Sequence, residues 1–447
     1  LPLRRRIGRG MSMSGNAVAR YARSAATALM LGLATLLAFT TPAQAQTADG
    51  DLDTSFSGDG KAIYGRTTGK DGLYHVFTQS NGDLVLSGWD NNNTSNSGAV
   101  RWANVEVNSS GSGTGLFSNP DDRLFWSPRS DEIWETLLMS DGRYVHVGAV
   151  GTHTTNSSKD YDCAVAVRKA NGDLDTTGFN SSGWLPATVT LSTSNAKGRF
   201  HVAFSTSVDD KCWAGAVQSD DKIIAAGYVS TNGTDIALAR VNTDGTLDTS
   251  FGTGGKVIAD LGGTDSIRAV EIDANGKIVV AGKAADDFFV ARYTTSGDLD
   301  TSFSGDGIHT FDMGAGASDQ LFGMKIQSDG KIVVAGHNGS GDWGVARLTS
   351  SGAMDTSFNS DGIVITDFGG SGDAARDLVI ASDGKILVGG YTNASGKYDF
   401  AVARYTSAGA LDTGFSSDGK ATVDIRGSNR DDYAYSIAIA GNGNVVL

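Results

Sequence analysis

Proline, cysteine and histidine are scarce in this chain of 447 residues, and the scarcity narrows its class. Five prolines stand against 60 glycines. Disordered low-complexity chains are usually rich in both residues, whereas these glycines recur at fixed places between apolar runs, as turn residues of a folded β protein do. The two cysteines, Cys163 and Cys212, have no zinc-ligand spacing. The sequence leaves open whether they form a disulfide or two separate buried thiols.

Motifs of known chemistry are absent. The six histidines show no H-E-x-x-H spacing, and no G-x-S-x-G elbow, P-loop or dinucleotide-binding fingerprint occurs. We therefore assign no catalytic residue and expect no organic cofactor. Carboxylates are plentiful, but the sequence does not say which of them converge, so a glycosidase-type pair stays open.

Residues 1–45 have the three-part pattern of a secretory signal peptide. Six arginines are followed by an apolar run from about Ala25 to Phe39, and Ala43-Gln44-Ala45 supplies small residues for cleavage. The run is short for a membrane span, although an uncleaved anchor is the alternative. The sequence predicts export to the extracellular space, the cell surface or the periplasm, with no membrane span in the remaining chain.

Basic residues are in the minority. Residues 46–447 contain 30 Lys and Arg residues and 50 Asp and Glu residues. So acidic a surface repels phosphate backbones, which excludes nucleic acid as a partner. We expect a monomer that binds an extracellular protein or a carbohydrate.

An internal repeat runs along the rest of the chain. Two-residue turns followed by apolar segments such as KIVVAG recur, and their second residues are 60, 79, 55, 54, 54 and 59 positions apart. An aspartate lies 11 positions before the second residue of each turn: Asp71, Asp131, Asp210, Asp265, Asp319, Asp373 and Asp432. A period of this size predicts a repeat architecture.

One unit shows the expected strands. Residues 256–261, 267–272, 277–281 and 288–293 are assigned as its first to fourth strands, and a 13-residue connection, 294–306, leads to the next unit. Asn275-Gly276 is a strong hairpin signal. The strand KIVVAG is apolar without alternation, which predicts cover on both faces. Radially packed sheets supply that cover.

The predicted fold is therefore all-β, a β-propeller of four-stranded antiparallel blades with about seven units, and a β-solenoid is the alternative. The repeat domain would span residues 46–447, with units starting near residues 52, 118, 174, 247, 299, 354 and 411. The last unit is expected to be incomplete, because it stops in its third strand.

The phrase Leu-Asp-Thr-Ser-Phe at 52–56, 247–251 and 299–303, together with GKIVVAG and DFAVARY, resembles the delta-60 repeat family of bacterial exported proteins, also described as a β-propeller domain of unknown function. The resemblance covers roughly residues 50–447 and is degenerate between Ala103 and Lys211. It implies a propeller fold and an exported or cell-surface setting. It supplies no activity.

A recurring Arg and Asp pair has a structural interpretation. Arg240, Arg292, Arg347 and Arg404 are each followed eight residues later by an aspartate: Asp248, Asp300, Asp355 and Asp412. We expect a bidentate contact that fixes each connection between blades. Val167 holds the arginine position in the second unit, which must manage differently.

One face of the propeller is expected to hold the variable loops, which are where recognition usually resides. These loops are 89–96, 150–162, 229–235, 283–287, 337–342 and 391–399. Aspartates on this face are weak candidates for Ca²⁺ ligands: Asp265, Asp287, Asp319, Asp342, Asp373 and Asp399. The favoured interpretation is that each aspartate caps a turn.

Six of the seven tryptophans precede residue 214, and they could form a contact surface or fill blade cores.

Two functions follow. The first is an exported, non-enzymatic repeat scaffold or binding module. The second is a hydrolase or lyase that acts on an extracellular polymer through acidic residues in the central pocket. Convergent carboxylates beside a basic residue at the channel mouth would favour the enzyme, whereas turn-capping aspartates alone would favour the scaffold.

Overall fold

A computed structural model of the chain describes residues 52, 57, 61, 71–90, 101–108, 112–117, 132–151, 161–183, 197–205, 208–231, 233–314, 318–427 and 430–447. All of them belong to one compact unit, Asp49–Leu447. The predicted signal peptide at 1–45 and Asp131 lie outside the described residues. Among those described, no helix is long and apolar enough to cross a membrane.

The described residues form six four-stranded antiparallel sheets, the blades. Blade 1 contains β1 (Asp71–Thr78), β2 (Leu84–Asp90), β3 (Arg101–Val107) and β4 (Gly113–Phe117). Blade 2 contains β5 (Glu132–Leu138), β6 (Tyr144–Gly151), β7 (Tyr161–Arg168) and β8 (Arg199–Val202). Blade 3 contains β9 (Asp210–Val217), β10 (Ile223–Val229), β11 (Asp235–Val241) and β12 (Lys256–Ala259).

Blade 4 contains β13 (Ser266–Ile272), β14 (Ile278–Ala284), β15 (Asp287–Tyr293) and β16 (Ile308–Phe311). Blade 5 contains β17 (Gln320–Ile326), β18 (Ile332–His337), β19 (Trp343–Leu348) and β20 (Ile363–Thr366). Blade 6 contains β21 (Ala374–Ile380), β22 (Ile386–Thr392), β23 (Asp399–Tyr405) and β24 (Lys420–Val423). A two-stranded sheet follows, formed by β25 (Ala438–Ile439) and β26 (Val445–Val446).

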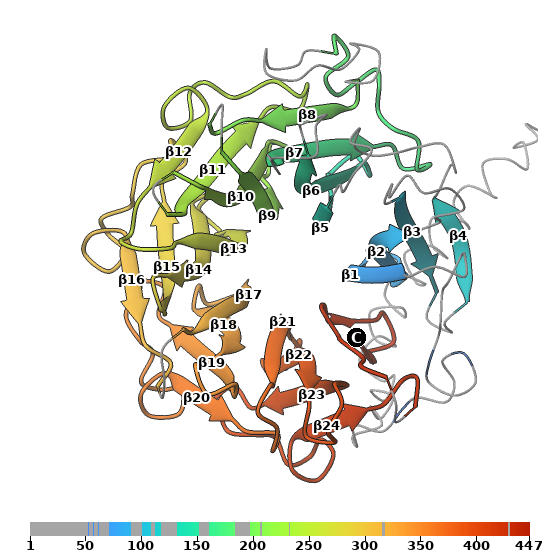
Figure 1. Ribbon diagram of the computed structural model, residues 1–447, viewed down its shortest axis with the longest axis vertical. Helices are drawn as coiled ribbons and strands as arrows, with labels where there is room; N and C mark the ends of the chain where they lie inside the picture. The colour runs from blue at the N-terminus through green and yellow to red at the C-terminus, as the bar shows by residue number, and fades with distance from the viewer. Residues whose placement is uncertain are drawn as a thin grey trace, which may run out of the picture. The chain divides into compact units, whose positions relative to one another are not determined.

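The blades follow one another around a central space, with the first strand of each blade innermost (Figure 1). Neighbouring innermost strands contact one another from β1 through β5, β9, β13, β17 and β21 to β25, and β25 contacts β1 in turn. The propeller prediction is confirmed, but the count differs. Six four-stranded blades are formed rather than about seven, and the β25–β26 sheet lies between blades 6 and 1.

The expected grouping of strands into units was shifted by one strand. Residues 256–259, assigned from the sequence as a first strand, form the outermost strand β12 of blade 3, paired with β11. The connection 294–307 with its Leu-Asp-Thr-Ser-Phe phrase therefore joins the third and fourth strands of blade 4, β15 and β16. Blades are instead linked by shorter segments such as 260–265.

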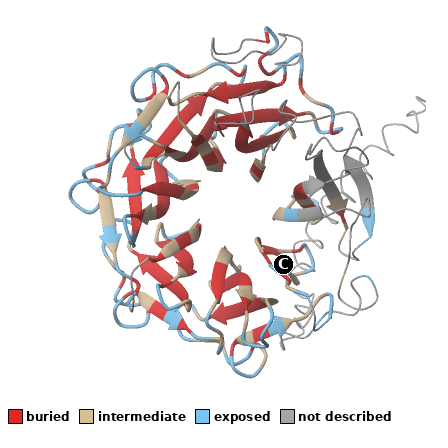
Figure 2. Cartoon of the chain, in the orientation of Figure 1, coloured by how far each residue is buried: buried red, intermediate tan, exposed pale blue. Residues whose placement is uncertain are grey.

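The core lies between blades, as the apolar runs predicted. Ile224 and Leu238 of blade 3 pack in one cluster with Ile267, Ile278 and Phe289 of blade 4. In blade 4, buried residues fill the middle two strands, and exposure rises at the outermost strand and the loops (Figure 2). Burial of both sheet faces explains why KIVVAG does not alternate.

The last glycine of the KIVVAG-type segments permits a bulge in the innermost strand. In blade 4 the register between β13 and β14 shifts at Ile267 and Ala269, so Arg268 is the extra residue. Gly282 lies opposite, where an added Cβ would sit 2.0 Å from the carbonyl oxygen of Ser266. Gly148, Gly227, Gly336 and Gly390 face equivalent bulges equally closely. Only glycine allows this backbone approach, and a bulge re-aims a side chain.

The recurring Arg and Asp pair forms a latch. Arg292 Nε donates to Asp300 Oδ2 at 2.6 Å, and its Nη1 donates to the carbonyl oxygen of Ser350 in blade 5. The other three pairs have Nε–Oδ2 distances of 2.6–2.8 Å. Each carboxylate receives a single guanidinium nitrogen, so the expected bidentate contact is corrected. In Arg240, Arg292 and Arg347 a second nitrogen donates to a backbone oxygen of the next blade, which makes the latch an inter-blade bond.

The phenylalanine and serine of the Leu-Asp-Thr-Ser-Phe phrase complete this latch. The Arg292 guanidinium lies 4.9 Å from the ring centroid of buried Phe303, and Ser302 Oγ donates to Asp300 at 2.7 Å. Blade 2 has Val167 at the arginine position, and there Arg143, just after the first hairpin, pairs with Asp175 at 3.0 Å.

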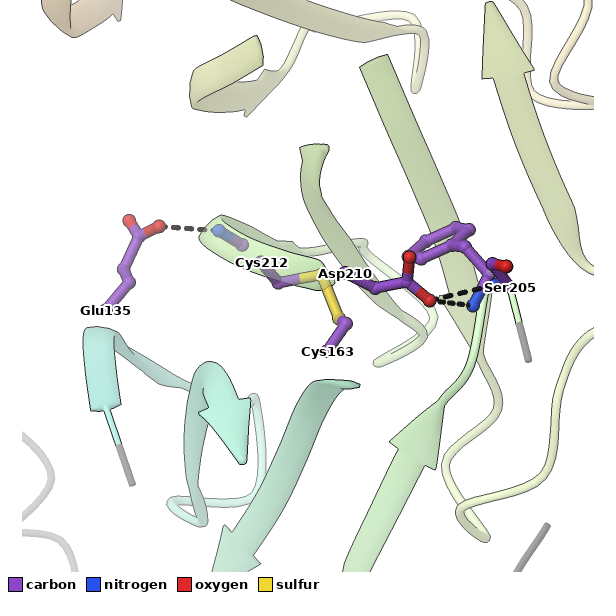
Figure 3. The surroundings of a disulfide bond; sticks show 7 residues. Glu135, Cys163, Ser205, Asp210 and Cys212 are labelled. Atoms are coloured by element: carbon purple, nitrogen blue, oxygen red, sulfur yellow. Dashed lines mark hydrogen bonds between the residues drawn. A yellow bond between two sulfur atoms is a disulfide. The ribbon is translucent and has the colours of Figure 1, made fainter. Parts of the chain in front are cut away.

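Cys163 and Cys212 form a disulfide, which settles the question that the sequence left open. It joins β7 of blade 2 to β9 of blade 3 (Figure 3). Two residues before Cys212, Asp210 accepts the backbone N–H groups of Phe204 and Ser205. Three residues after it, Gly215 donates its N–H to Glu135 in blade 2. The disulfide thus reinforces a blade interface that also lines the centre of the propeller.

Candidate functional site

A central pocket of about 580 Å³ lies among the innermost strands and is the candidate site. Every blade contributes residues to its wall, and so does the segment that leads into β25. Central pockets with few polar groups among aromatic side chains are typical ligand sites. This wall has two groups of residues, which differ in chemistry.

The first group, the mouth ring, stands three positions after the recurring aspartate in each unit. Its members are Tyr74, Trp134, Trp213, Arg268, Phe322, Arg376 and Tyr435. In the six blades this position is the bulged residue of the innermost strand, which points the side chain at the pocket. Five aromatic rings and two guanidinium groups therefore converge from seven repeats.

Neighbouring side chains of the mouth ring contact one another. The Arg268 guanidinium lies 3.2 Å from the centroid of Trp213 and 5.6 Å from that of Phe322. Arg376 lies 3.9 Å from Phe322 and 4.9 Å from Tyr435. The rings of Tyr435 and Tyr74 are 5.1 Å apart, and those of Tyr74 and Trp134 are 5.0 Å apart. Cation–π and aromatic contacts thus hold these side chains in place.

Three further tyrosines border the mouth ring on the face with the variable loops. Tyr391, at the end of β22, lies 5.4 Å from Tyr398 and 4.9 Å from Tyr433 between ring centroids. Tyr433 is 38% exposed. The predicted variable face therefore carries aromatic surface next to the pocket.

The second group, the acid cluster, comprises Glu135, Glu271, Lys325 and Asp377. Lys325 Nζ pairs with Glu271 Oε1 at 2.5 Å. Asp377 Oδ2 accepts Ser436 Oγ at 2.7 Å and the N–H of Ile437 at 3.1 Å. Burial lowers the pKa of Lys325, but the charges of Glu271 and Asp377 outweigh it, so the pKa lies above its ordinary value. These carboxylates already have partners within the chain.

Glu135 differs from the other two carboxylates of the acid cluster in its protonation state. Burial raises its pKa from 4.5 to about 8, against the opposing effect of the Gly215 N–H that its Oε2 accepts. The carboxyl is therefore protonated at neutral pH, when it can donate a proton or a hydrogen bond. Burial likewise lowers the pKa of nearby His75 to about 4, so that imidazole is neutral.

We expect Glu135→Gln to flatten the pH dependence of stability. The folded-state pKa lies above the ordinary value, so the stability contribution of the protonated group is complete below about pH 4.5 and is lost as the pH rises through about 8. Because the side chain is partly exposed to the pocket, the expected loss between pH 5 and 8.5 is only about 1–2 kcal/mol. Urea unfolding at both pH values would measure it.

The matched control is Asp286→Asn, which removes a carboxylate that is 65% exposed. Its pH profile should follow that of the wild type. Equal slopes for Glu135→Gln and the wild type would contradict the assignment of a raised pKa to Glu135.

The aspartates named as weak Ca²⁺ candidates do come together on the loop face. Four clusters hold three carboxylates whose nearest oxygens lie within 4.8 Å of one another: Asp235, Asp260 and Asp265; Asp287, Asp312 and Asp319; Asp342, Asp367 and Asp373; Asp399, Asp424 and Asp432. The members at the ends of the outermost strands, Asp260, Asp312, Asp367 and Asp424, were missed from the sequence, although they too recur there.

The buried member of each cluster caps loops, as the favoured interpretation held. Asp319 Oδ2 accepts the N–H of Met313 and its Oδ1 that of Gly339, which ties the inter-blade link to the β18–β19 loop. Asp265 and Asp373 hold their loops in the same way. In the fourth cluster Arg426 Nε also donates to Asp432. Ca²⁺ binding at these clusters stays a prediction.

Comparison with known proteins supports the fold and assigns no activity. Residues 218–251, 274–303, 327–358 and 381–415 match the family model described as Domain of unknown function (DUF5122) beta-propeller. These segments make up less than half of the chain, so they show a likeness to that family, and the delta-60 name stays an interpretation. No curated protein matches the sequence.

Solved structures are similar in fold alone. A catalytically inactive virginiamycin B lyase from Staphylococcus aureus with quinupristin is 12% identical, with a TM-score of 0.44 over 78% of this chain and 86% of that one. A protein of unknown function from Dyadobacter fermentans is also 12% identical, with a TM-score of 0.43 over 74% of this chain and 93% of that one. At this identity, nothing of their chemistry transfers to this chain.

Proposed function

We propose that this chain is an exported, non-enzymatic binding module whose ligand enters the central pocket through the mouth ring. The observation that carries the proposal is the convergence of five aromatic rings and two guanidinium groups from seven repeats on one pocket. Rigid aromatic side chains give large contact area at low entropic cost. A repetitive scaffold needs no such ring for stability, since its core lies between the blades.

The proposed partner is the end of an extracellular carbohydrate chain. A pocket of about 580 Å³ suits one or two sugar units rather than a protein surface. The exposed tyrosine border around Tyr433 would extend the contact outward from the pocket. A monomer suffices, because residues of a single chain line the pocket on every blade and on the segment that leads into β25.

We expect Trp213→Ala to weaken retention of the protein on immobilised extracellular polysaccharides at least about tenfold, as the loss of a central aromatic contact does. Affinity electrophoresis against a panel of neutral and acidic polysaccharides would measure it. The control is Ile258→Ala, which truncates an exposed apolar residue of the outermost strand β12. Equal retention of Trp213→Ala and the wild type on every polysaccharide that retains the protein would refute the proposal.

A second candidate is a hydrolase or lyase acting on the same polymer, and the acid cluster favours it. Three carboxylates and Lys325 face one pocket. Glu135 is protonated at neutral pH and could act as a general acid, whereas a charged neighbour could act as a base, and acid–base catalysis needs both roles. We place this candidate second because Glu271 and Asp377 are engaged by Lys325 and Ser436. Chain cleavage by the wild type and none by Glu135→Gln would reverse the order.

A further inference from the structure

Two cations in the mouth ring lack a compensating charge. Burial and the positive charge of nearby Arg376 lower the pKa of Arg268 to about 9. Within the described part of the chain, neither guanidinium forms an ion pair with a carboxylate. Both side chains are half-buried, and charges that lose part of their contact with water are normally paired.

The geometry leaves their donors free for a ligand. The Trp213 ring centroid lies 3.2 Å from the Arg268 guanidinium and the Phe322 centroid 3.9 Å from that of Arg376, close enough to cover one face of each. The N–H donors lie in the guanidinium plane, at its edge. Among the described residues Arg268 has no hydrogen-bond acceptor, and nearby Tyr391 raises the pKa of Arg376 against the effect of burial. A stacked guanidinium with open edges is arranged to hold a planar anion.

The charges around the pocket agree. Its ionised groups are Arg268, Arg376 and Lys325 against Glu271 and Asp377, since Glu135 is protonated at neutral pH. The pocket therefore has one excess positive charge, although the whole chain has a net charge of −14. One bound anion would make the pocket neutral.

We propose that Arg268 and Arg376 bind the carboxylate of the ligand, and that a ring of the same ligand stacks on the aromatic side chains between and beside them. Carboxylate is the anion whose planar geometry matches a guanidinium edge. The ligand is then an acidic sugar or an aromatic acid, which share this chemistry. The inference rests on the proposed binding function and names the class of its ligand.

A structural role for these arginines makes a different prediction about stability. If Arg268 and Arg376 serve ligand binding rather than stability, Arg268→Met removes a cation that has no counter-charge. The midpoint of thermal unfolding should then stay unchanged or rise. The control is Arg292→Met, which removes the latch to Asp300 and Ser350 and should lower the midpoint clearly. A comparable fall for Arg268→Met would overturn the inference.

Binding is tested by calorimetric titration with two matched pairs of probes. Glucuronate is compared with glucose, and benzoate with benzyl alcohol, on the wild-type chain and on the double variant Arg268→Gln, Arg376→Gln. We expect at least one acid to bind about 10- to 100-fold more tightly than its neutral counterpart, the gain from charge-assisted hydrogen bonds. The double variant should bind both members of a pair equally.

The titrations distinguish between the two classes of ligand. Preference for glucuronate alone supports an acidic sugar, preference for benzoate alone supports an aromatic acid, and preference for both supports the shared carboxylate. The inference is overturned if no acid binds, if acids bind no better than neutral probes, or if the double variant keeps the preference. Should Trp213→Ala still lose retention on a polysaccharide in that case, the binding function stands and only the anionic ligand is rejected.

Discussion

Replacing Asp300 with alanine is expected to lower the free energy of unfolding by about 3–5 kcal/mol, the cost of breaking a buried ion pair from one side. Asp300 is 7% exposed and Arg292 is 9% exposed. The carboxylate accepts Arg292 Nε at 2.6 Å, Lys277 Nζ at 2.7 Å and Ser302 Oγ at 2.7 Å. Its removal leaves two cations without their partner, and the connection 294–307 loses its anchor.

Urea unfolding at pH 7, followed by tryptophan fluorescence, would measure this loss. Asp298→Ala is the matched control, because Asp298 lies two residues away in an exposed turn and should change stability by no more than about 0.5 kcal/mol. Equal unfolding midpoints for Asp300→Ala and Asp298→Ala would show that the latch contributes nothing.

The pH dependence gives an independent check on the same residue. Burial raises the pKa of Asp300, but the hydrogen bonds from Lys277, Ser302 and Arg292 outweigh it, so the pKa lies below its ordinary value of 3.8. The contribution of a lowered carboxylate pKa is present above pH 3.8 and is lost as the pH falls through the folded-state value. The gap between the wild type and Asp300→Ala should therefore narrow in acid.

Removal of the disulfide is expected to have the second large effect. Cys163 and Cys212 are 49 residues apart, and cross-linking a loop of this length stabilises a chain by about 4 kcal/mol in the chain-entropy account. The double variant Cys163→Ala, Cys212→Ala should lose this amount. Both sulfur atoms lie in the fully buried core between blades 2 and 3, so the loss of packing adds to it.

Reduction provides the comparison. A phosphine reductant should lower the unfolding midpoint of the wild type toward that of the double variant and leave the double variant unchanged. A midpoint of the wild type that does not move on full reduction would contradict a stabilising disulfide. The pairing itself is checked by peptide mapping, which should recover the fragments around Cys163 and Cys212 as one linked species.

Local patterns in the sequence predicted local structure well. Asn275-Gly276 predicted the hairpin that joins β13 and β14, and the unbroken apolar run of KIVVAG predicted a strand covered on both faces. The eight-residue spacing of Arg292 and Asp300 predicted their contact. Each of these features depends on residues close together in the chain, and the repeat shows them several times.

The division into blades could not be predicted in the same way. The length of a repeat does not show where one unit ends and the next begins. Residues 256–259 could therefore equally begin one sheet or end another. The long connection 294–307 suggested a passage between blades, yet it joins β15 to β16, whose first residue Ile308 pairs with Ala291 near the end of β15. The pairing of Cys163 with Cys212 also depends on how blades 2 and 3 pack.

The mouth ring was missed for a different reason. Tyrosine, tryptophan, phenylalanine and arginine occupy one repeated position, so no residue type recurs there. A fixed distance of three residues after the aspartate was the available signal, as with Arg268 after Asp265. Its meaning depends on the bulge at Ile267 and Ala269, and an alternating strand pattern does not predict a bulge.

The direction of the arginine latch bears on how such a chain could have lengthened. Arg240 of blade 3 reaches Thr295 of blade 4, Arg292 of blade 4 reaches Ser350 of blade 5, and Arg347 of blade 5 reaches Ser407 of blade 6. Every donor points forward to a backbone oxygen, which any side chain at the acceptor position would offer. A duplicated gene segment therefore carries the arginine that bonds to the next blade, and that blade needs no particular side chain to accept the bond. This favours growth of the chain by tandem duplication.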